Sequence, residues 1–215
     1  MISSQKIIGT IEHEGFELGY CIDGTGIPTL VIGSAIYYPR TFSKNLRSHL
    51  RMVFMDHRGF AKSLKPFDKS AFELDKLVDD IEALRQNLGL TQIAIMGHSG
   101  HAFMALEYAK KYPACVSHVL IIASSPNASP NTFYAADRYF NESVCPERKT
   151  LYESSMKRLQ SDIKSSPEKR FILYSLRSGP RIWYDAKYDA AHLWQEVKVI
   201  PEMFDYVWGE LFKKN

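Results

Sequence analysis

The stretch that decides the fold is IAIMGHSGHAFMALEYAKK, residues 93–111. Its first four residues form an apolar run typical of a strand buried on both faces, and from Phe103 onward the apolar residues recur at helical spacing. Residues 97–102 therefore form a strand-to-helix turn that carries Ser99. A reactive serine needs a tight turn, backbone N–H groups for the oxyanion and a general base within reach. The stretch offers the first two and predicts that Ser99 is a nucleophile.

Similar apolar runs precede and follow this stretch, at residues 29–32, 52–55 and 119–122. Between the second and third runs, apolar residues recur at helical spacing over residues 74–88, and Ser70 with Glu73 forms a capping-box pattern. The alternation over residues 29–123 predicts a doubly wound, mostly parallel α/β sheet. Residues 6–22 predict an antiparallel hairpin in front of it.

The pattern changes after residue 125, where a predicted loop is followed by helical periodicity without further strands. The expected helices span residues 146–163, 168–176, 188–196 and 201–212, with residues 171–174 as the most strand-like alternative. We therefore expect a core domain over residues 1–125 and a helical cap or lid over 126–215. All three tryptophans, Trp183, Trp194 and Trp208, fall in the second part. They predict either an aromatic lining over a pocket or simply the core of a small lobe.

Composition limits the classes of partner. The 215 residues carry a net charge of +3 without a block of consecutive Lys or Arg that would make a phosphate-binding stripe, so nucleic acid is not an expected partner. The three cysteines lack the C-x-x-C spacing of a zinc site and argue against a disulfide framework. No apolar stretch has the length of a signal peptide core or a bilayer span, which predicts a cytoplasmic protein without a membrane partner.

Three motifs resemble those of the α/β-hydrolase superfamily. The strand, the residues GHSG (97–100) and the following helix resemble its nucleophile elbow. The segment DHRGFAKS (56–63) resembles the D-x-R-G-x-G-x-S segment of many members, and the apolar strand ending in Gly33 and Ser34 resembles the loop that lends an oxyanion N–H. The helical segment after residue 125 resembles that of proline iminopeptidase-like serine hydrolases.

The resemblance implies that Ser99 is the nucleophile and that the N–H of Gly100 is one oxyanion donor. The second donor would come from Ser34 or from Ala35. At two positions where the family pattern has glycine, this chain has Ala61 and His101. Crowding at position 101 should be relieved by a shifted helix or by an imidazole turned outward.

Other histidines are weaker candidates for a catalytic role. The side chain of His98, inside the turn, is expected to point away from Oγ of Ser99. His118 would lie about 13 Å along the strand, at its far end. His192 with Asp185 or Asp189 could reach down from the cap, although caps seldom supply the base in this family.

In the superfamily the catalytic acid and histidine follow the serine, after the seventh and eighth strands. No such strands follow the predicted cap, and the chain stops at Asn215. We therefore expect a hydrolase truncated at its C-terminus, with the last two strands of the core missing. The sixth strand, residues 116–123, would then form the edge of the sheet and is expected to pair, either in a homodimer or in an aggregation-prone fragment.

The function that follows from the resemblance is a serine hydrolase that cleaves a small-molecule ester or amide by acyl transfer, without a metal or organic cofactor. Trp183 and Tyr184 are candidates for contact with the substrate. One alternative is a prolyl aminopeptidase-type peptidase, in which Glu196, Glu202 or Asp205 would meet a free amino end. The other is a non-catalytic ligand-binding fragment that lacks the acid and the histidine.

Overall fold

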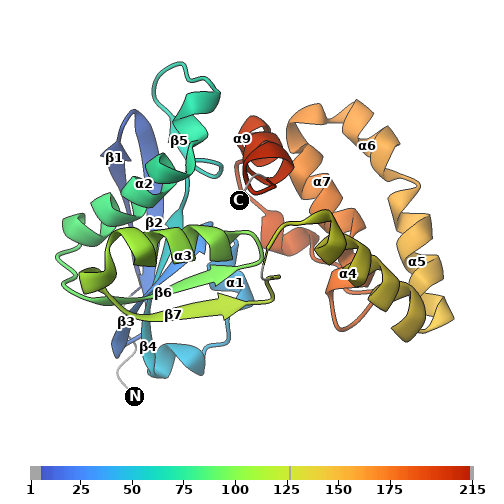
Figure 1. The fold of residues 1–215 in the computed structure, drawn as a ribbon, viewed down its shortest axis with the longest axis horizontal. Coiled ribbons are helices and arrows are strands. Elements are labelled where there is room, and N and C mark those ends of the chain that lie inside the picture. The colour runs from blue at the N-terminus through green and yellow to red at the C-terminus, as the bar shows by residue number, and fades with distance from the viewer. Residues whose placement is uncertain (1–5, 126, 214–215) are drawn as a thin grey trace.

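A computed structural model describes residues 6–125 and 127–213 and shows a mixed sheet with helices on both faces (Figure 1). Within these residues the sheet has seven strands, in the order β1-β2-β4-β3-β6-β7 with the short β5 paired to β2. The strands are β1 (Ile7–His13), β2 (Phe16–Asp23), β3 (Ile27–Gly33), β4 (Leu50–Asp56), β5 (Lys62–Ser63), β6 (Ile93–His98) and β7 (Val116–Ile122). The predicted doubly wound α/β architecture is confirmed.

The first two strands form the predicted antiparallel hairpin. Glu14 and Gly15 close it with φ angles of +49° and +85°, and Ile11 of β1 pairs with Leu18 of β2. Positive φ at both turn residues matches the right-handed twist of the flanking strands. The hairpin adds an antiparallel margin to the sheet, because β2 also runs antiparallel to β4.

Strands β3, β4, β6 and β7 are parallel, as the apolar runs predicted. On one face, Leu30 and Ile32 of β3 join a core with α2 (Leu74–Asn87) and α3 (His101–Lys111). On the other face, Val31 packs in a smaller core with Tyr38 of α1 (Tyr38–Thr41), close to the short helix η1 (Leu46–Ser48). Burial on both faces explains why β3, β4 and β6 lack alternation.

The outer edge of β7 is open. Among the described residues β7 pairs only with β6, and Val119 and Ile121 are 37% and 44% exposed. The short helix η3 (Pro113–Cys115) leads into this strand. The expectation that residues 116–123 form an edge of the sheet is confirmed for the described chain.

The predicted capping box at Ser70 and Glu73 is wrong. Ser70 lies in η2 (Lys69–Phe72), where Asp68 is the cap and its side chain accepts the N–H of Ser70 at 2.8 Å. Glu73 is the N-cap residue of α2 but makes no side-chain capping bond. Its carboxylate instead accepts the hydroxyl of Tyr206, a long-range contact that local spacing does not encode.

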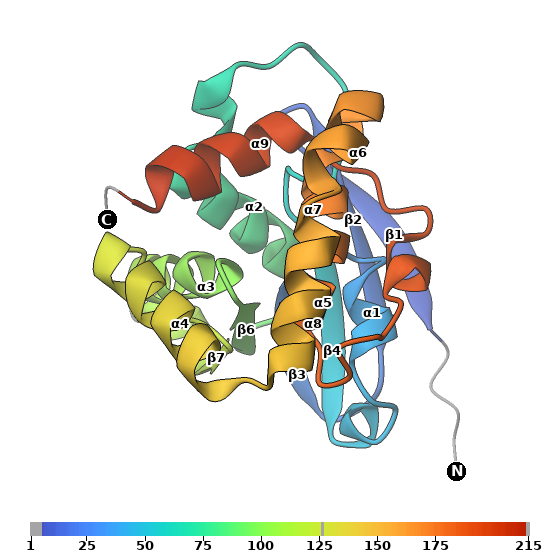
Figure 2. The same cartoon turned by 90° about the vertical axis from the view of Figure 1, so that its right-hand side faces the viewer.

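The second part of the described chain is helical, and Figures 1 and 2 show α4 to α8 grouped beyond the carboxyl ends of the parallel strands. Its elements are α4 (Pro130–Ser143), α5 (Pro146–Met156), α6 (Leu159–Ser165), η4 (Pro167–Lys169), α7 (Arg170–Arg177), α8 (Gly179–Ile182), η5 (Ala191–Trp194), α9 (Pro201–Tyr206) and the π-helical turn η6 (Val207–Leu211).

Several helix predictions in this part need correction. The helix expected over residues 146–163 is divided into α5 and α6, and that over 188–196 shrinks to the single turn η5. Helix α4 was missed, because Ser129 and Pro130 mark its N-cap and first turn rather than a loop. The strand-like residues 171–174 lie in α7.

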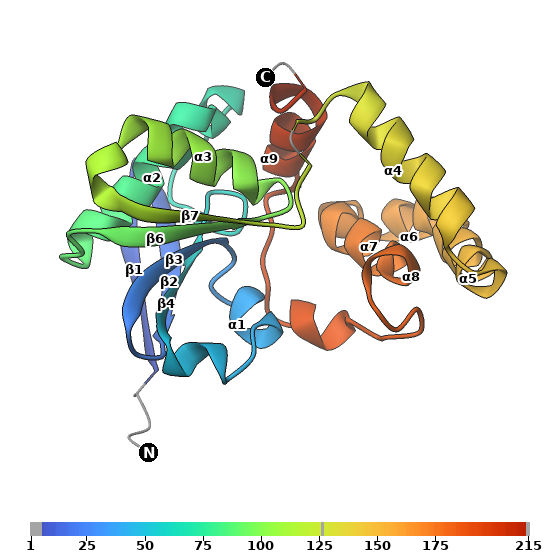
Figure 3. The same cartoon turned by 60° about the horizontal axis from the view of Figure 1, so that its bottom comes forward.

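The α9 and η6 segment lies between the sheet and the other helices of this part (Figure 3). Met203, Val207 and Phe212 belong to the same hydrophobic core as the sheet and α2. The division into residues 1–125 and 126–215 stays a prediction, as does the truncation at Asn215; residues 1–5, 126, 214 and 215 lie outside the described chain. Of the described helices, none combines the length and the apolarity needed to cross a membrane.

Candidate active site at the turn after β6

Ser99 lies at the carboxyl end of β6 in a strained backbone conformation. Its φ is +55°, a left-handed value that residues other than glycine rarely adopt, and its side chain is exposed. The N–H of Ser99 donates to the carbonyl oxygen of Ile122 at 2.9 Å, and its own carbonyl accepts the N–H of Ala102 at 3.0 Å. The turn therefore joins β7 to the first turn of α3 and lifts the hydroxyl away from the sheet.

Glycine is required just before this turn. A Cβ on Gly97 would lie 2.6 Å from Cα of Ala102, a distance that real Cβ atoms do not tolerate. The start of α3 can thus approach β6 closely only because position 97 has no side chain.

The N–H of Gly100 is available for an anion. Gly100 is buried at the N-cap of α3, and among the described residues no backbone bond uses its N–H. The first N–H groups of a helix lack intrahelical acceptors and carry the positive end of the helix dipole. A negative oxygen next to Ser99 would meet this group.

The loop after β3 distinguishes the two candidates for a second donor. The N–H of Ala35 already donates to Oδ1 of Asp56 at 2.7 Å. The Oγ of Ser34 accepts the N–H groups of Ile36 and Tyr37, at 3.2 and 3.1 Å, and so holds the start of α1. The N–H of Ser34 has no acceptor within the described chain. Of the two candidate donors, Ser34 and Ala35, Ser34 is therefore the one whose N–H is free.

His101 is turned inward, so the expectation of an outward imidazole is wrong. Its Nδ1 lies 3.1 Å from both the hydroxyl of Tyr38 and the carbonyl of His98, and its Nε2 lies 3.0 Å from Nε2 of His57. The side chain is buried and replaces the glycine of the family pattern by making polar contacts under the turn. Two of these partners, Tyr38 of α1 and His57 just after β4, are distant in sequence, so the residues around position 101 do not reveal them.

The hydrogen bonds fix where the protons lie in this buried imidazole array of His57, His98 and His101. Nδ1 of His57 accepts the N–H of Gly59 at 2.9 Å, so neutral His57 carries its proton on Nε2 and donates it to His101. His101 then carries its proton on Nδ1 and donates toward Tyr38 and the His98 carbonyl. The Tyr38 hydroxyl is left to donate to Nδ1 of His98, 3.1 Å away.

All three imidazoles of the array are held neutral. Burial lowers the pKa of His101 to about 3, and it lowers the pKa of His57 well below its usual value. Burial also lowers the pKa of His98. A second proton on His57 or His101 would set two N–H donors against each other, so the array is a fixed support rather than a proton acceptor at neutral pH.

No described histidine is hydrogen-bonded to Oγ of Ser99. His118 pairs beside Ala94 on the sheet, at the far end of β6 from the turn. His192 is exposed, with Nε2 3.2 Å from the hydroxyl of Tyr188. The two candidate acids beside His192 accept local backbone N–H groups instead. Asp185 accepts the N–H of Lys187, and Asp189 accepts the N–H of Ala191.

The predicted substrate contacts Trp183 and Tyr184 are not brought to the turn by any contact among the described residues. Trp183 packs against Tyr188 with ring centroids 5.0 Å apart, and Tyr184 is 100% exposed. Arg148 donates to the backbone carbonyls of both residues, which fixes them beside α5.

Trp208, one of the three tryptophans expected either to line a pocket or to form a small core, lies against the turn at Gly100, whereas sequence reasoning missed its neighbour Phe204. Phe204 and Trp208 lie 5.6 and 6.1 Å from the ring of His57, and Trp208 meets His101 edge-on at 5.4 Å. The only signal was their spacing of four residues, which places both on one helical face.

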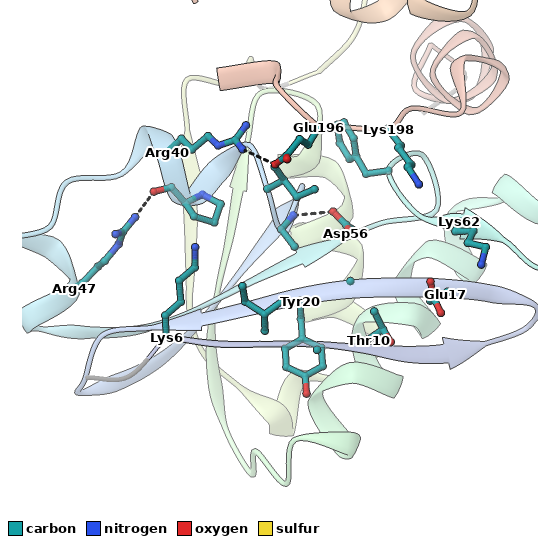
Figure 4. A pocket seen from close by; sticks show the side chains of 17 residues that line it. Lys6, Thr10, Glu17, Tyr20, Arg40, Arg47, Asp56, Lys62, Glu196 and Lys198 are labelled. Carbon is teal, nitrogen blue, oxygen red and sulfur yellow. Dashed lines mark hydrogen bonds and ion pairs between the residues drawn. The ribbon is translucent and has the colours of Figure 1, made fainter. Parts of the chain in front are cut away.

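A cavity of 480 Å³ lies behind the loop after β3, on the side of the β1–β2 hairpin (Figure 4). Ala35 and Asp56 line it, together with five cationic side chains: Lys6, Arg40, Arg47, Lys62 and Lys198. Ser99 is not among the lining residues. Burial raises the pKa of Asp56 to about 7, even though three hydrogen-bond donors oppose the shift.

Arg58 in the DHRGFAKS segment has a structural role. Its guanidinium is buried and pairs with both carboxylate oxygens of Asp80, at 2.7 and 2.8 Å, and with Glu14 at 2.9 Å. The arginine thus ties the hairpin turn to α2. Among the described residues no group of three or more His, Cys, Asp or Glu side chains could hold a metal ion, and the cysteines are free thiols.

A parallel sheet with a strained, exposed serine between strand and helix defines the fold class of α/β hydrolases. The sequence model described as the alpha/beta hydrolase fold matches residues 25–201. The AB hydrolase superfamily protein YclE of Bacillus subtilis is 40% identical over 206 residues, which cover 96% of this chain and 73% of YclE. The chain therefore belongs to the α/β-hydrolase superfamily.

Other similarities are more distant. Proline iminopeptidase of Heyndrickxia coagulans is 32% identical over 108 residues, 48% of this chain and 36% of that protein. A proline iminopeptidase-related protein of Thermus thermophilus matches with a TM-score of 0.53 at 22% identity, over 80% of this chain and 60% of that one. An epoxide hydrolase of Bacillus megaterium matches with a TM-score of 0.57 at 18% identity, over 93% and 71%. The two structures support the fold alone.

Proposed function

We propose that the protein is a serine hydrolase that cleaves small esters or amides by acyl transfer through Ser99. The observation that carries the proposal is the backbone of this residue: an exposed serine held at φ +55° between a parallel strand and a helix N-terminus. Left-handed strain in a non-glycine residue persists only where the surrounding structure fixes it, and such strain is concentrated at functional sites.

The chemistry proceeds in two steps. Oγ of Ser99 attacks the carbonyl carbon, its proton passes to a general base, and the carbonyl oxygen becomes an oxyanion held by the N–H groups of Gly100 and Ser34. Collapse of this intermediate expels the alcohol or amine, which takes up a proton, and leaves an acyl-serine. Water then attacks the acyl carbon, releases the carboxylic acid and returns the proton to Oγ. Removal of one oxyanion donor typically costs about 100-fold to 1000-fold in rate.

The imidazole array supports this arrangement indirectly. His101 at the start of α3 is bonded to His57 after β4 and to Tyr38 of α1. The array therefore connects the element that carries Gly100 with the loop that carries Ser34. We assign it the positioning of the two oxyanion donors.

An ester or simple amide is preferred over a peptide with a free amino end. The carboxylates that could meet such an amine already pair with arginines: Glu196 with Arg40 at 3.6 Å, and Glu202 and Asp205 with Arg170. Trp208, which lies against Gly100, packs with the aromatic cluster of Phe60 and Phe204, and this surface suits an apolar acyl group.

The second candidate is a protein that binds ligands without turning them over. It is favoured by one observation: within residues 6–125 and 127–213, no histidine is bonded to Oγ of Ser99. Saturable binding of an ester analogue with no hydrolysis of p-nitrophenyl acetate above background would support it.

A fluorophosphonate probe tests the proposed function directly. The probe forms a covalent bond with activated serines, so the wild-type protein should be labelled and the Ser99→Ala variant should not. Ser63→Ala serves as the matched control, because Ser63 ends the short strand β5 and its Oγ donates to the carbonyl of Lys65. Equal labelling of wild type and Ser99→Ala would refute Ser99 as the nucleophile.

A further inference from the structure

Two glycines of the hydrolase motifs make room for aromatic side chains of the α9–η6 segment. A Cβ on Gly100 would lie 2.6 Å from Cε2 of Trp208 and closer still to its Nε1. A Cβ on Gly59 would lie 2.9 Å from Cε2 of Phe204. Because Phe204 and Trp208 are one helical turn apart, a single helical face fits against both glycines.

The position of Trp208 relates it to the proposed oxyanion site. Its indole lies against the residue whose N–H is the first proposed donor, and that residue is the direct neighbour of Ser99. The His101 ring is 5.4 Å away on one side, with Phe204 and Phe212 each 5.2 Å away. The indole therefore fills the space that a side chain on residue 100 would otherwise occupy.

The indole N–H has no acceptor in the described chain. Trp208 is half-buried, and no hydrogen bond of the described residues involves Nε1. Nε1 is not among the buried, unpartnered side-chain atoms of the described residues, so the N–H stays in contact with water and is open to an oxygen of a ligand. Trp208 also lies in η6, a π-helical turn, and such turns are frequent at functional sites.

We propose that Trp208 contacts the substrate and determines its specificity. Its ring forms the wall of the acyl site beside Gly100 and restricts the acyl group to a short chain, and its N–H donates to an oxygen of the ester or amide. The inference rests on the proposed function, because it assigns the substrate class of the same site.

The dependence of the hydrolysis rate on the length of the acyl chain tests whether the ring of Trp208 limits the acyl site. Wild type should hydrolyse p-nitrophenyl acetate faster than p-nitrophenyl octanoate. Trp208→Ala should shift the ratio of the two kcat/KM values by about 10-fold or more in favour of octanoate. This is the size of discrimination that an apolar pocket typically gives. Trp208→Phe retains most of the wall but lacks the N–H, so it should lower kcat/KM about fivefold for both esters, the value of one neutral hydrogen bond. An unchanged profile in Trp208→Ala would overturn the proposal.

A double-mutant cycle tests the contact with Gly100. Gly100→Ala keeps the backbone N–H but displaces the indole, so it should lower kcat/KM in the wild-type background and have little further effect in Trp208→Ala. Gly209→Ala is the matched control, because a Cβ on Gly209 meets no atom within 4 Å, and it should leave kcat/KM unchanged. An equal loss from Gly100→Ala in both backgrounds would contradict the proposal.

Fluorophosphonate labelling separates this inference from the function on which it rests. If Ser99 is labelled in wild type and the Trp208 variants keep the wild-type ester profile, the hydrolase stands and the role of Trp208 is refuted. If Ser99 of the wild type is not labelled, the hydrolase itself fails. Circular dichroism melting of each variant identifies losses that come from unfolding, and Trp208→Phe provides a conservative variant where Trp208→Ala does not fold.

Discussion

At the scale of single residues, the conformation of Ser99 should be measurable as strain. A side chain in the left-handed region costs roughly 1–2 kcal/mol relative to glycine. We expect Ser99→Gly to be about 1 kcal/mol more stable than Ser99→Ala in urea unfolding, because only glycine relieves φ +55°. At Ala102 in α3 the preference between glycine and alanine should reverse, because glycine weakens a helix, and Ala102→Gly should cost about 1 kcal/mol of stability. Equal stability of Ser99→Gly and Ser99→Ala would argue against a strained turn.

His101 should make the fold sensitive to acid. Its pKa is about 3 in the folded protein and near 6.5 when unfolded, so between these values the unfolded chain binds the extra proton. The contribution of His101 to the free energy of unfolding is therefore fully present above pH 6.5 and is lost as the pH falls toward 3. The slope of this loss is about 1.4 kcal/mol per pH unit for one group.

His101→Gln removes this titration. The free energy of unfolding of the variant should therefore fall less steeply between pH 6 and pH 4, by up to about 1.4 kcal/mol per pH unit. Asp56 acts in the opposite direction, because its pKa is raised to about 7, but it is present in both proteins and cancels in the difference. Urea unfolding at several pH values gives both curves. Parallel curves for wild type and His101→Gln would contradict the buried, neutral state of His101.

At the scale of elements, the buried Arg58 couples the β1–β2 hairpin to α2. Replacing it by methionine should destabilise the fold by about 3–5 kcal/mol, because the carboxylate of Asp80 would remain buried with His13 as its one charged partner among the described residues. The exposed pair Lys69–Glu210 is the control, and Lys69→Ala should cost no more than about 1 kcal/mol. Denaturant midpoints compare the stability of Arg58→Met and Lys69→Ala. If Arg58→Met loses little stability, α2 holds the hairpin without the pair of Arg58 and Asp80.

Strands β3, β4 and β6 were predictable from sequence because each contains a continuous apolar run that the sheet buries on both faces, as Leu30 and Val31 illustrate. The turn at Ser99 was predictable because its glycine spacing is local. The contacts of His101 and Trp208 were not, since both depend on elements distant in the sequence. Helix α4 was missed because Ser and Pro before a helix resemble those of a loop.

At the scale of the whole molecule, the edge of β7 that is open within the described residues is a candidate site of association. Unpaired backbone groups beside Val119 and Ile121 form a template for another strand, and two copies can pair through the same edge about a two-fold axis. We propose a homodimer joined through β7. In size-exclusion chromatography with light scattering, wild type should elute at twice the mass of the chain and dissociate on dilution.

A charge on this edge should prevent the pairing. Ile121→Lys places an ammonium group on one face of the edge strand, beside the position of a partner strand. Charged side chains on edge strands are a device by which natural proteins avoid association, so this variant should be a monomer. Tyr139→Lys on α4, which is 74% exposed, carries the same change of charge away from the edge and should remain dimeric. A wild-type protein that stays monomeric at all concentrations would refute the dimer. An Ile121→Lys protein that remains dimeric would place the interface elsewhere on the surface.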